Sequence, residues 1–220
     1  MPTLPPEAFL AIGIVIFFGL GLHEYAHAKF ADMAGDPTPR YFGRVTLNLF
    51  KHFDPLGALM IAITAISGFG IGWGKPVPMD PRKMRNPKWD HFMAVAAGPL
   101  SNLLQAVVWA VILRGLLASG IQFNNFAGML CLFGVTVNLS LCFFNLIPLG
   151  PLDGHWLVGT FMPENMRAKW YLWNRQMGSF LLLGIVILGQ LSNTSVITKV
   201  IGPPIRFFFS LLVGTRMDMF

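Results

Sequence analysis

Charged side chains are scarce in this sequence of 220 residues: Asp, Glu, Lys and Arg make up 12% of it, about half the share found in soluble domains. Hydrophobic residues account for 54%, and the mean hydropathy is +0.59. This shortage of charge excludes an ordinary soluble protein and leaves almost nothing for a separate soluble domain. We therefore expect an integral membrane protein.

Acidic residues are scarcer than basic ones, with 10 Asp and Glu against 16 Lys and Arg. A basic surface for nucleic acid is one interpretation of the net charge of +6, but the cations fall in short loops between apolar runs. Charges placed in this way orient a protein in a membrane. We therefore expect the lipid bilayer, and no nucleic acid, as a partner.

Cysteine is nearly absent, and Cys131 and Cys142 lie in one apolar segment. In a helix they would be about 16 Å apart along the axis, too far for a disulfide. The marks of a cleavable signal peptide are also missing, since no Lys or Arg precedes residue 8 and no small-residue cleavage pattern follows. We expect the first apolar run to be retained as a membrane span.

Six apolar segments predict an all-α, polytopic membrane protein formed by one domain, residues 1–220. A helix of about 20 residues crosses the hydrocarbon core. Core spans are therefore expected at 7–31, 92–117 and 126–149, and accessory spans at 177–191, which is somewhat short, and 196–214. The segment 56–73 contains four glycines and ends in Gly-Trp-Gly. We expect this second apolar segment to re-enter or to lie against the bundle without crossing, giving five to six transmembrane helices.

Positive charge predicts the orientation of these spans. The loops on either side of 56–73 are both rich in Lys and Arg, and such loops prefer the cytoplasmic side. They would lie on opposite sides of the membrane if 56–73 crossed it. We expect a multi-pass protein of the cell membrane with its amino terminus outside. Two cytoplasmic stretches, 40–50 with alternating polar and apolar residues and the proline-containing 74–79, are predicted to be short β-strand pieces.

A His-Glu-x-x-His motif, from His23 to His27, ends the first apolar run. Two histidines four residues apart lie on one face of a helix and can hold one metal ion, while Glu24 can reach a water bound there. The five letters alone could equally be two surface histidines and a solvated acid. Residues 8–22 contain no charge, however, and ionisable side chains at membrane depth are costly and usually functional. The motif therefore predicts a zinc site in the bilayer, with Glu24 within reach of a water bound to the metal.

A zinc site of this kind needs a third protein ligand. The candidates near the membrane are Asp32, Asp36, His52, Asp54, Asp80, Asp90, His91, Asp153 and His155. The span 126–149 runs from outside to inside, so Asp153 should emerge at the depth of the two histidines. It follows a stretch broken by prolines, which a membrane tolerates only beside protein or a polar cavity. Asp153-Gly154 alone would be an ordinary turn, but at this depth we expect Asp153 to be the ligand.

Three motifs together resemble the site-2 protease family of intramembrane zinc metalloproteases: His23-Glu24-x-x-His27, Ala97-Gly98-Pro99-Leu100-Ser101-Asn102, and Asn145-x-x-Pro148 followed by Leu152-Asp153-Gly154. The resemblance extends from about Glu7 to Gly159. It implies that His23, His27 and Asp153 bind one Zn²⁺ per chain and that Glu24 is the general base. Gly150 is a departure, because relatives often have a further proline there. The PDZ domain of larger members is missing, since only a short loop follows the middle core span.

Three further residues are candidates for the site, and two of them have a second interpretation. Asn145 and Asn102 could bind the substrate or the oxyanion, although Asn145 could also be an interhelical packing contact. His52 could lie behind the ligands or relay a proton, but a histidine that caps the second apolar segment through Asp54 is the favoured interpretation. His91 and His155 are expected to be loop or interface histidines.

The expected function is hydrolysis of peptide bonds within or near transmembrane helices of other membrane proteins, with the active site towards the cytoplasmic side. A substrate helix must unwind first, and the stretches 44–49 or 74–79 could bind the unwound strand by β-addition. The alternative is a membrane metal-binding protein or transporter that uses the same ligands. A transporter would place several ionisable groups along a path, and these spans are nearly bare of them. A catalytically inactive adaptor is disfavoured because Glu24 and all three ligands are present. The sequence does not indicate the oligomeric state.

Overall fold

Long apolar helices dominate the computed structural model, which describes residues 5–67, 72–123, 125–192 and 195–214. Five helical stretches are long and apolar enough to cross a membrane. They are α1 (Pro6–Met33), α4 (Trp89–Ala118), α5 (Phe126–Asn145), the stretch Glu164–Gly189 and α9 (Val196–Val213). The chain is therefore a multi-pass membrane protein.

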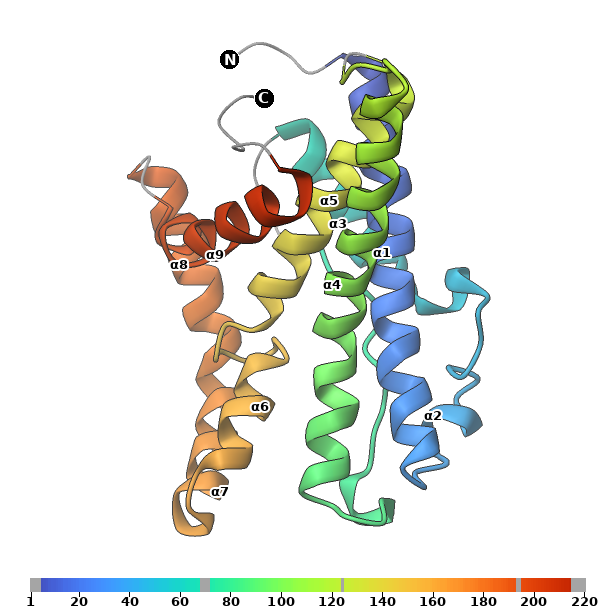
Figure 1. Ribbon diagram of the computed structural model, residues 1–220. Coiled ribbons are helices and arrows are strands. Elements are labelled where there is room, and N and C mark those ends of the chain that lie inside the picture. The colour runs from blue at the N-terminus through green and yellow to red at the C-terminus, as the bar shows by residue number, and fades with distance from the viewer. Residues whose placement is uncertain (1–4, 68–71, 124, 193–194, 215–220) are drawn as a thin grey trace.

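The helices α1, α4 and α5 pack against one another and form the centre of the bundle (Figure 1). Small residues let them approach closely. An added β-carbon on Gly134 of α5 would overlap the Trp109 ring of α4, and one on Gly19 of α1 would lie 3.0 Å from Leu141 of α5. Close approach through glycines is how helices associate in a membrane, where apolar surface gains nothing from leaving lipid. This three-helix centre carries the residues discussed below.

The fourth candidate span is longer than expected. The sequence predicts a short segment at 177–191, whereas the helix begins as α7 (Glu164–Trp173), continues through a π-helical turn (Asn174–Gly178) and ends as α8 (Ser179–Leu191). Charged and aromatic residues in α7 hide this first half from a search for apolar runs. Conversely, α5 ends at Asn145 and not at 149, because the prolines that follow cannot continue a helix.

The last helix, α9, runs across the bundle, transverse to α4 and α8 (Figure 1). It buries Ile205, Phe209 and Val213 against the centre, where α5 is its main neighbour. Lys199 and Arg206, seven residues apart, are both exposed and project from one side of the helix. The composition of α9 is that of a span, but its direction is not that of α1 or α4.

Between α1 and α4 the described residues contain no β-strand, so the predicted strand pieces at 40–50 and 74–79 are wrong. The first stretch forms α2 (Thr38–Tyr41), a turn and a 3₁₀ helix (Leu49–His52). The second is extended but pairs only through one isolated bridge, between Phe53 and Gly74. Its prolines lack the N–H groups that a strand ladder requires.

The second apolar segment forms α3 (Pro55–Ser67), a helix of 13 residues. It is shorter than the 20 or so residues that a crossing needs. Gly68 and Gly70, part of the predicted re-entrant turn, lie outside the described residues. The chain then returns beside α3, since an added β-carbon on Gly72 would touch Ile61.

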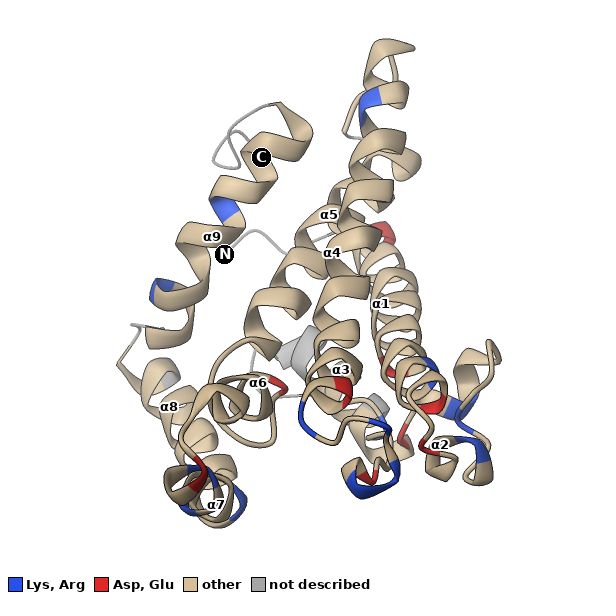
Figure 2. Cartoon of the chain, turned by 60° about the horizontal axis from the view of Figure 1, so that its bottom comes forward, with Lys and Arg blue, Asp and Glu red and all other residues tan. Residues whose placement is uncertain are grey.

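The chain between α1 and α4 begins and ends at the same end of the bundle. The buried carboxylate of Asp36 accepts hydrogen bonds from the backbone of Thr38 at 2.9 Å and of Asp80 at 2.7 Å. The Arg85 backbone donates to the Ala34 carbonyl at 3.0 Å. Figure 2 shows that Lys and Arg residues gather around this end, near α2 and α7. The loop after α1 and the loop before α4 therefore lie on the same side of the molecule.

Candidate metal centre

Helix α1 places His23 and His27 one turn apart, and both side chains are buried, with 4% of each residue exposed. Their Nε2 atoms lie 3.0 Å apart. Because α1 is continuous from Pro6 to Met33, the helical period alone brings the two rings together. This half of the site follows from local structure.

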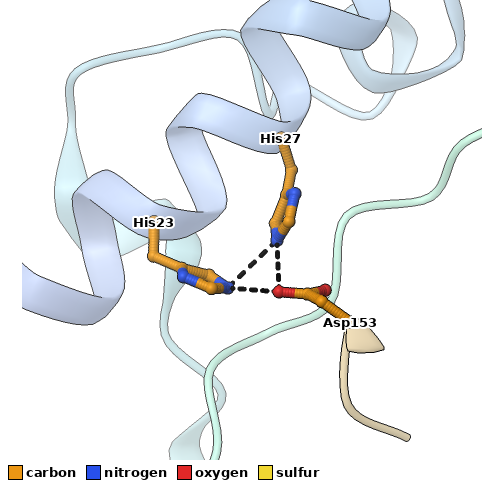
Figure 3. Close-up of side chains that lie close together, drawn as sticks. All are labelled: His23, His27 and Asp153. Carbon is orange, nitrogen blue, oxygen red and sulfur yellow. Dashed lines mark hydrogen bonds and ion pairs between the residues drawn. The ribbon is translucent and has the colours of Figure 1, made fainter. Parts of the chain in front are cut away.

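Asp153 reaches the same point from the turn that precedes α6 (Gly154–Phe161). Its Oδ2 atom lies 3.3 Å from Nε2 of His23 and 3.3 Å from Nε2 of His27 (Figure 3). In the part of the chain that the structure describes, these three residues are the one group of His, Cys, Asp or Glu that could hold a metal ion. The structure thus brings together the three ligands predicted from the sequence.

The lone pairs of this cluster converge. The other ring nitrogen of His23 lies 2.7 Å from Asn102 Oδ1, and that of His27 lies 2.9 Å from the Ala94 carbonyl. Both partners accept, so each Nδ1 carries the proton and each Nε2 presents a lone pair. The Oδ2 atom of Asp153 is buried and has no hydrogen-bond donor among the described residues. A cation is the group that satisfies three such atoms at once.

The spacing of the three atoms fits zinc. Ligand atoms about 2.0–2.2 Å from a tetrahedral zinc ion lie about 3.3–3.6 Å from one another. The two separations from Asp153 Oδ2 are 3.3 Å each, and the two histidine nitrogens are slightly closer, at 3.0 Å. Two neutral imidazoles and one carboxylate form a donor set that leaves a fourth position for water or substrate.

Asn102 stands behind His23 and does not face the cavity. It is fully buried, and its Nδ2 donates to the Gly19 carbonyl and to Asn138 Oδ1, both at 3.0 Å. These two bonds leave Asn102 Oδ1 to accept from the His23 ring. Asn138 in turn donates to the Gly134 carbonyl at 2.9 Å. Asn102 Oδ1 therefore orients the His23 ring, and Asn102 is not among the residues that line the cavity.

Gly98 of α4 faces the two ligand histidines. An added β-carbon there would overlap the His27 imidazole and lie 2.7 Å from Cε1 of His23. Any side chain at this position would displace the ligands. The glycine was visible in the sequence as part of the Gly-Pro motif, but its role depends on how α4 packs against α1.

Glu24 lies on the wall of the same cavity as the ligands. The extended chain after α3 passes directly over it, because an added β-carbon on Gly74 would lie 3.0 Å from Glu24 Oε1. Gly74 therefore allows this segment to contact the carboxylate. The sequence marked Glu24 and the segment 74–79 separately, but it did not indicate that they touch.

The cavity has a volume of about 500 Å³ and a mostly apolar lining. Its walls come from α1, the segment Gly72–Met79, the end of α5, the turn before α6, and α8. Asn145 lines it, and its Nδ2 donates to the Leu141 carbonyl at 2.9 Å. Of the two asparagines proposed to contact substrate, Asn145 is thus the one with access to the cavity.

His52 is tied to the segment that passes over Glu24. Its Nε2 lies 2.9 Å from the Thr46 carbonyl, and Nδ1 lies 3.5 Å from Arg44 Nη2. Burial lowers the pKa of His52, and the Arg44 charge lowers it further, so the neutral ring donates to Thr46 and accepts from Arg44. The buried Arg44 guanidinium also donates to the carbonyls of Lys75 and Pro76. His52 therefore supports the cavity wall, and Asp54 caps α3 by accepting from Gly57 at 2.9 Å.

His91 and His155 pack against aromatic rings as interface residues. The His91 ring lies 5.2 Å from the Trp156 ring, and the His155 ring lies 4.6 Å from it. Neither belongs to the metal-binding group found among the described residues. This agrees with the expectation for both.

Sequence comparison identifies proteins similar to this chain. It is 34% identical over 165 residues to "Putative zinc metalloprotease YwhC" of Bacillus subtilis, covering 73% of this chain and 72% of that protein. The chain belongs to the site-2 protease family. It is 28% identical over 179 residues to "Putative zinc metalloprotease Rip2" of Mycolicibacterium smegmatis and 28% identical over 172 residues to the protein of that name in Mycobacterium tuberculosis. The matches span 76% of this chain and 64% of each Rip2 protein. No protein-family model and no solved structure matches it.

Membership of a zinc metalloprotease family agrees with the donor set. The three clustered side chains can hold zinc, and the resemblance based on motifs names the same residues. The chain fits the short form of the family, since α4 and α5 are joined by the short loop 119–125.

Proposed function

We propose that this protein is an intramembrane zinc metalloprotease that cleaves peptide bonds within or near transmembrane helices. The observation that carries the proposal is the buried cluster of His23, His27 and Asp153 beside Glu24 on one cavity within the bundle. A hydrolase needs both a metal and a base at the cavity. A transporter would need further ionisable groups along a path, and the described residues offer only this metal-binding group.

The four side chains divide the chemistry. His23, His27 and Asp153 hold one zinc ion, which when bound supplies Lewis acidity towards water and a substrate carbonyl. Glu24, on the neighbouring face of α1, accepts the proton of the attacking water at its carboxylate. It then returns this proton to the amine nitrogen that leaves. General base and acid catalysis by one carboxylate contributes about 10²–10⁴-fold to such reactions.

The substrates that suit this cavity are unwound stretches of transmembrane helices. Its lining is mostly apolar, and one wall is the extended segment Gly72–Met79, whose backbone can offer hydrogen bonds to an extended peptide. Asn145 supplies an amide beside Asp153 for the substrate backbone or the oxyanion. Helix α8 lines the cavity with Leu182, Leu183 and Val186, and with Ser179 at its start.

We further propose that the amino terminus is outside the cell and that the site opens towards the cytoplasmic side. The positively charged end of the bundle supports this, because Lys and Arg favour the cytoplasmic side. The hydrogen bond from the Asp80 backbone to the Asp36 carboxylate supports a second apolar segment that enters and returns without crossing.

Cleavage of a single-span test protein by the purified enzyme in detergent tests the function. Wild type should cleave it, a zinc chelator should stop cleavage, and added zinc should restore it. Glu24→Gln should retain zinc and lose at least about 10²-fold in rate, because the amide cannot accept the proton. Cleavage that persists in chelator, or full activity of Glu24→Gln, would refute the proposal.

A further inference from the structure

Two side chains of α7 and the following π turn bind the segment that carries Asp153. Trp170 and Asn174 are four residues apart and therefore lie on one face of the helix. Asn174 Oδ1 accepts a hydrogen bond from the Gly150 backbone at 2.8 Å, and Trp170 Nε1 donates to the His155 carbonyl at 2.8 Å. The two contacts bracket Asp153 from both sides along the chain.

The Asn174 side chain is buried at this contact, and hydrogen bonds fix its orientation. Only 1% of it is exposed, and its Nδ2 donates to the Trp170 carbonyl at 3.1 Å, which fixes the amide so that Oδ1 faces Gly150. A buried amide must satisfy both of its ends, and here one end is used by the helix and the other by the turn.

The backbones also touch at this point. An added β-carbon on Gly150 would lie 2.9 Å from the Asn174 carbonyl, and one on Gly178 would lie 2.8 Å from the nitrogen and oxygen of Gly150. Asn174 and Gly178 are the first and last residues of the π-helical turn. Single π turns inside helices often occur at functional sites, and this one presents both residues to Gly150.

Asp153 needs such support more than the two histidines do. His23 and His27 stand on a continuous helix, and each has a fixed partner at Nδ1. Asp153 stands at the end of a turn, and its Oδ2 atom has no hydrogen-bond donor among the described residues. Its position relative to the histidines therefore depends on how the turn is held.

We propose that Trp170 and Asn174 are positioning residues that hold the Asp153 turn and thereby set the affinity and geometry of the metal site. This inference rests on the proposed zinc site. It assigns to the α7–α8 helix a role in the site itself, in addition to lining the cavity. Neither residue lies among those that line the cavity, so they act through Asp153.

Zinc affinity, measured by competition with a chromogenic chelator, tests the proposal in an inactive Glu24→Gln background. Asn174→Leu should weaken zinc binding about 10–100-fold, as loss of a partner behind a ligand commonly does. Trp170→Phe, which keeps the ring and removes only the N–H donor, should weaken it less. Asn165→Leu and Trp173→Phe, at exposed positions of the same helix, should change it less than twofold.

Visible absorption of the cobalt-loaded protein reports ligand geometry and would not change if Asn174 were only structural. The spectrum of Asn174→Leu should shift towards that of Asp153→Ala. In the Asp153→Ala background, Asn174→Leu should add no further loss of cobalt affinity, since both changes act on one ligand.

Zinc binding by Asn174→Leu and Trp170→Phe within twofold of wild type would overturn the proposal, as would equal weakening by Asn165→Leu. If Asn174→Leu does not fold, the conservative Trp170→Phe decides. Tight zinc binding without proteolysis by the Glu24-containing protein would refute the proposed function. It would leave the positioning role of Trp170 and Asn174 valid.

Discussion

At the scale of single residues, the metal site is fixed by partners that do not touch the metal position. Asn102 and the Ala94 carbonyl hold the Nδ1 atoms of the two histidines, so both Nε2 atoms are free to bind. Such partners orient ligands and raise metal affinity. Gly98 has no room for a side chain, because an added β-carbon would overlap the two histidines.

The Gly98→Ala variant should therefore contain much less zinc than the wild type. Its β-carbon would overlap the His27 ring, whereas Gly115 of the same helix has no neighbour within 4 Å of an added β-carbon. We expect zinc content and proteolysis to fall at least about tenfold in Gly98→Ala. Gly115→Ala should keep both and should be as stable as wild type or slightly more stable, since alanine favours a helix. Metal analysis of the purified variants measures this, and a zinc-loaded Gly98→Ala would contradict the geometry.

At the scale of elements, the connection between α1 and α4 forms a wall of the site without forming a sheet. Arg44 and His52 hold the extended segment in place through the carbonyls of Lys75 and Pro76 and a bond from the Lys75 N–H to the His52 carbonyl at 2.8 Å. The segment then contacts Glu24 through Gly74. Arg44 thus acts on the site through the backbone of another element.

Arg44→Met should disturb this wall and leave the metal centre in place. Loss of hydrogen bonds from a buried charged group costs about 1.5–3 kcal/mol, so we expect proteolytic efficiency to fall at least about tenfold. Zinc content should remain that of wild type. Arg40→Met is the matched control, because the Arg40 side chain is 70% exposed and pairs with the nearby Asp32 of α1. Kinetics with a single-span substrate test the pair, and unchanged efficiency in Arg44→Met would refute the role of Arg44.

At the scale of the whole molecule, Lys and Arg are distributed unequally between the two ends of the bundle. The end formed by α2, α7 and the loop before α4 collects most Lys and Arg residues (Figure 2), while the loop 119–125 has none. The transverse α9 presents Lys199 and Arg206 on one exposed side. By length and composition this helix is one of the five described helices that could cross a membrane.

Labelling of single cysteines in intact cells tests the topology. A cysteine that replaces Arg40, Lys83 or Arg167 should be protected from a thiol reagent that cannot cross the membrane. A cysteine that replaces Gly120 should react. The native Cys131 and Cys142 are buried and should stay silent. Reaction at Lys83 with protection at Arg40 would show that the second apolar segment crosses.

The sequence by itself determined the membrane setting, the five long apolar helices and the pair His23 and His27, because these depend on composition and on the helical period. It also pointed to Asp153 through charge, prolines and resemblance. It missed the α7 half of the fourth span and predicted strands at 40–50 and 74–79, where local alternation has no neighbouring strand to pair with.

Only the tertiary structure decided how the ligands are held. The contacts of Asn102 with His23, Gly98 with His27, Arg44 with Lys75 and Asn174 with Gly150 join segments distant in the sequence. No local period encodes such contacts, since they depend on how helices with small residues pack together. The candidate metal ligands can thus be predicted along the chain, whereas the groups that orient them are defined only by the packing of the bundle.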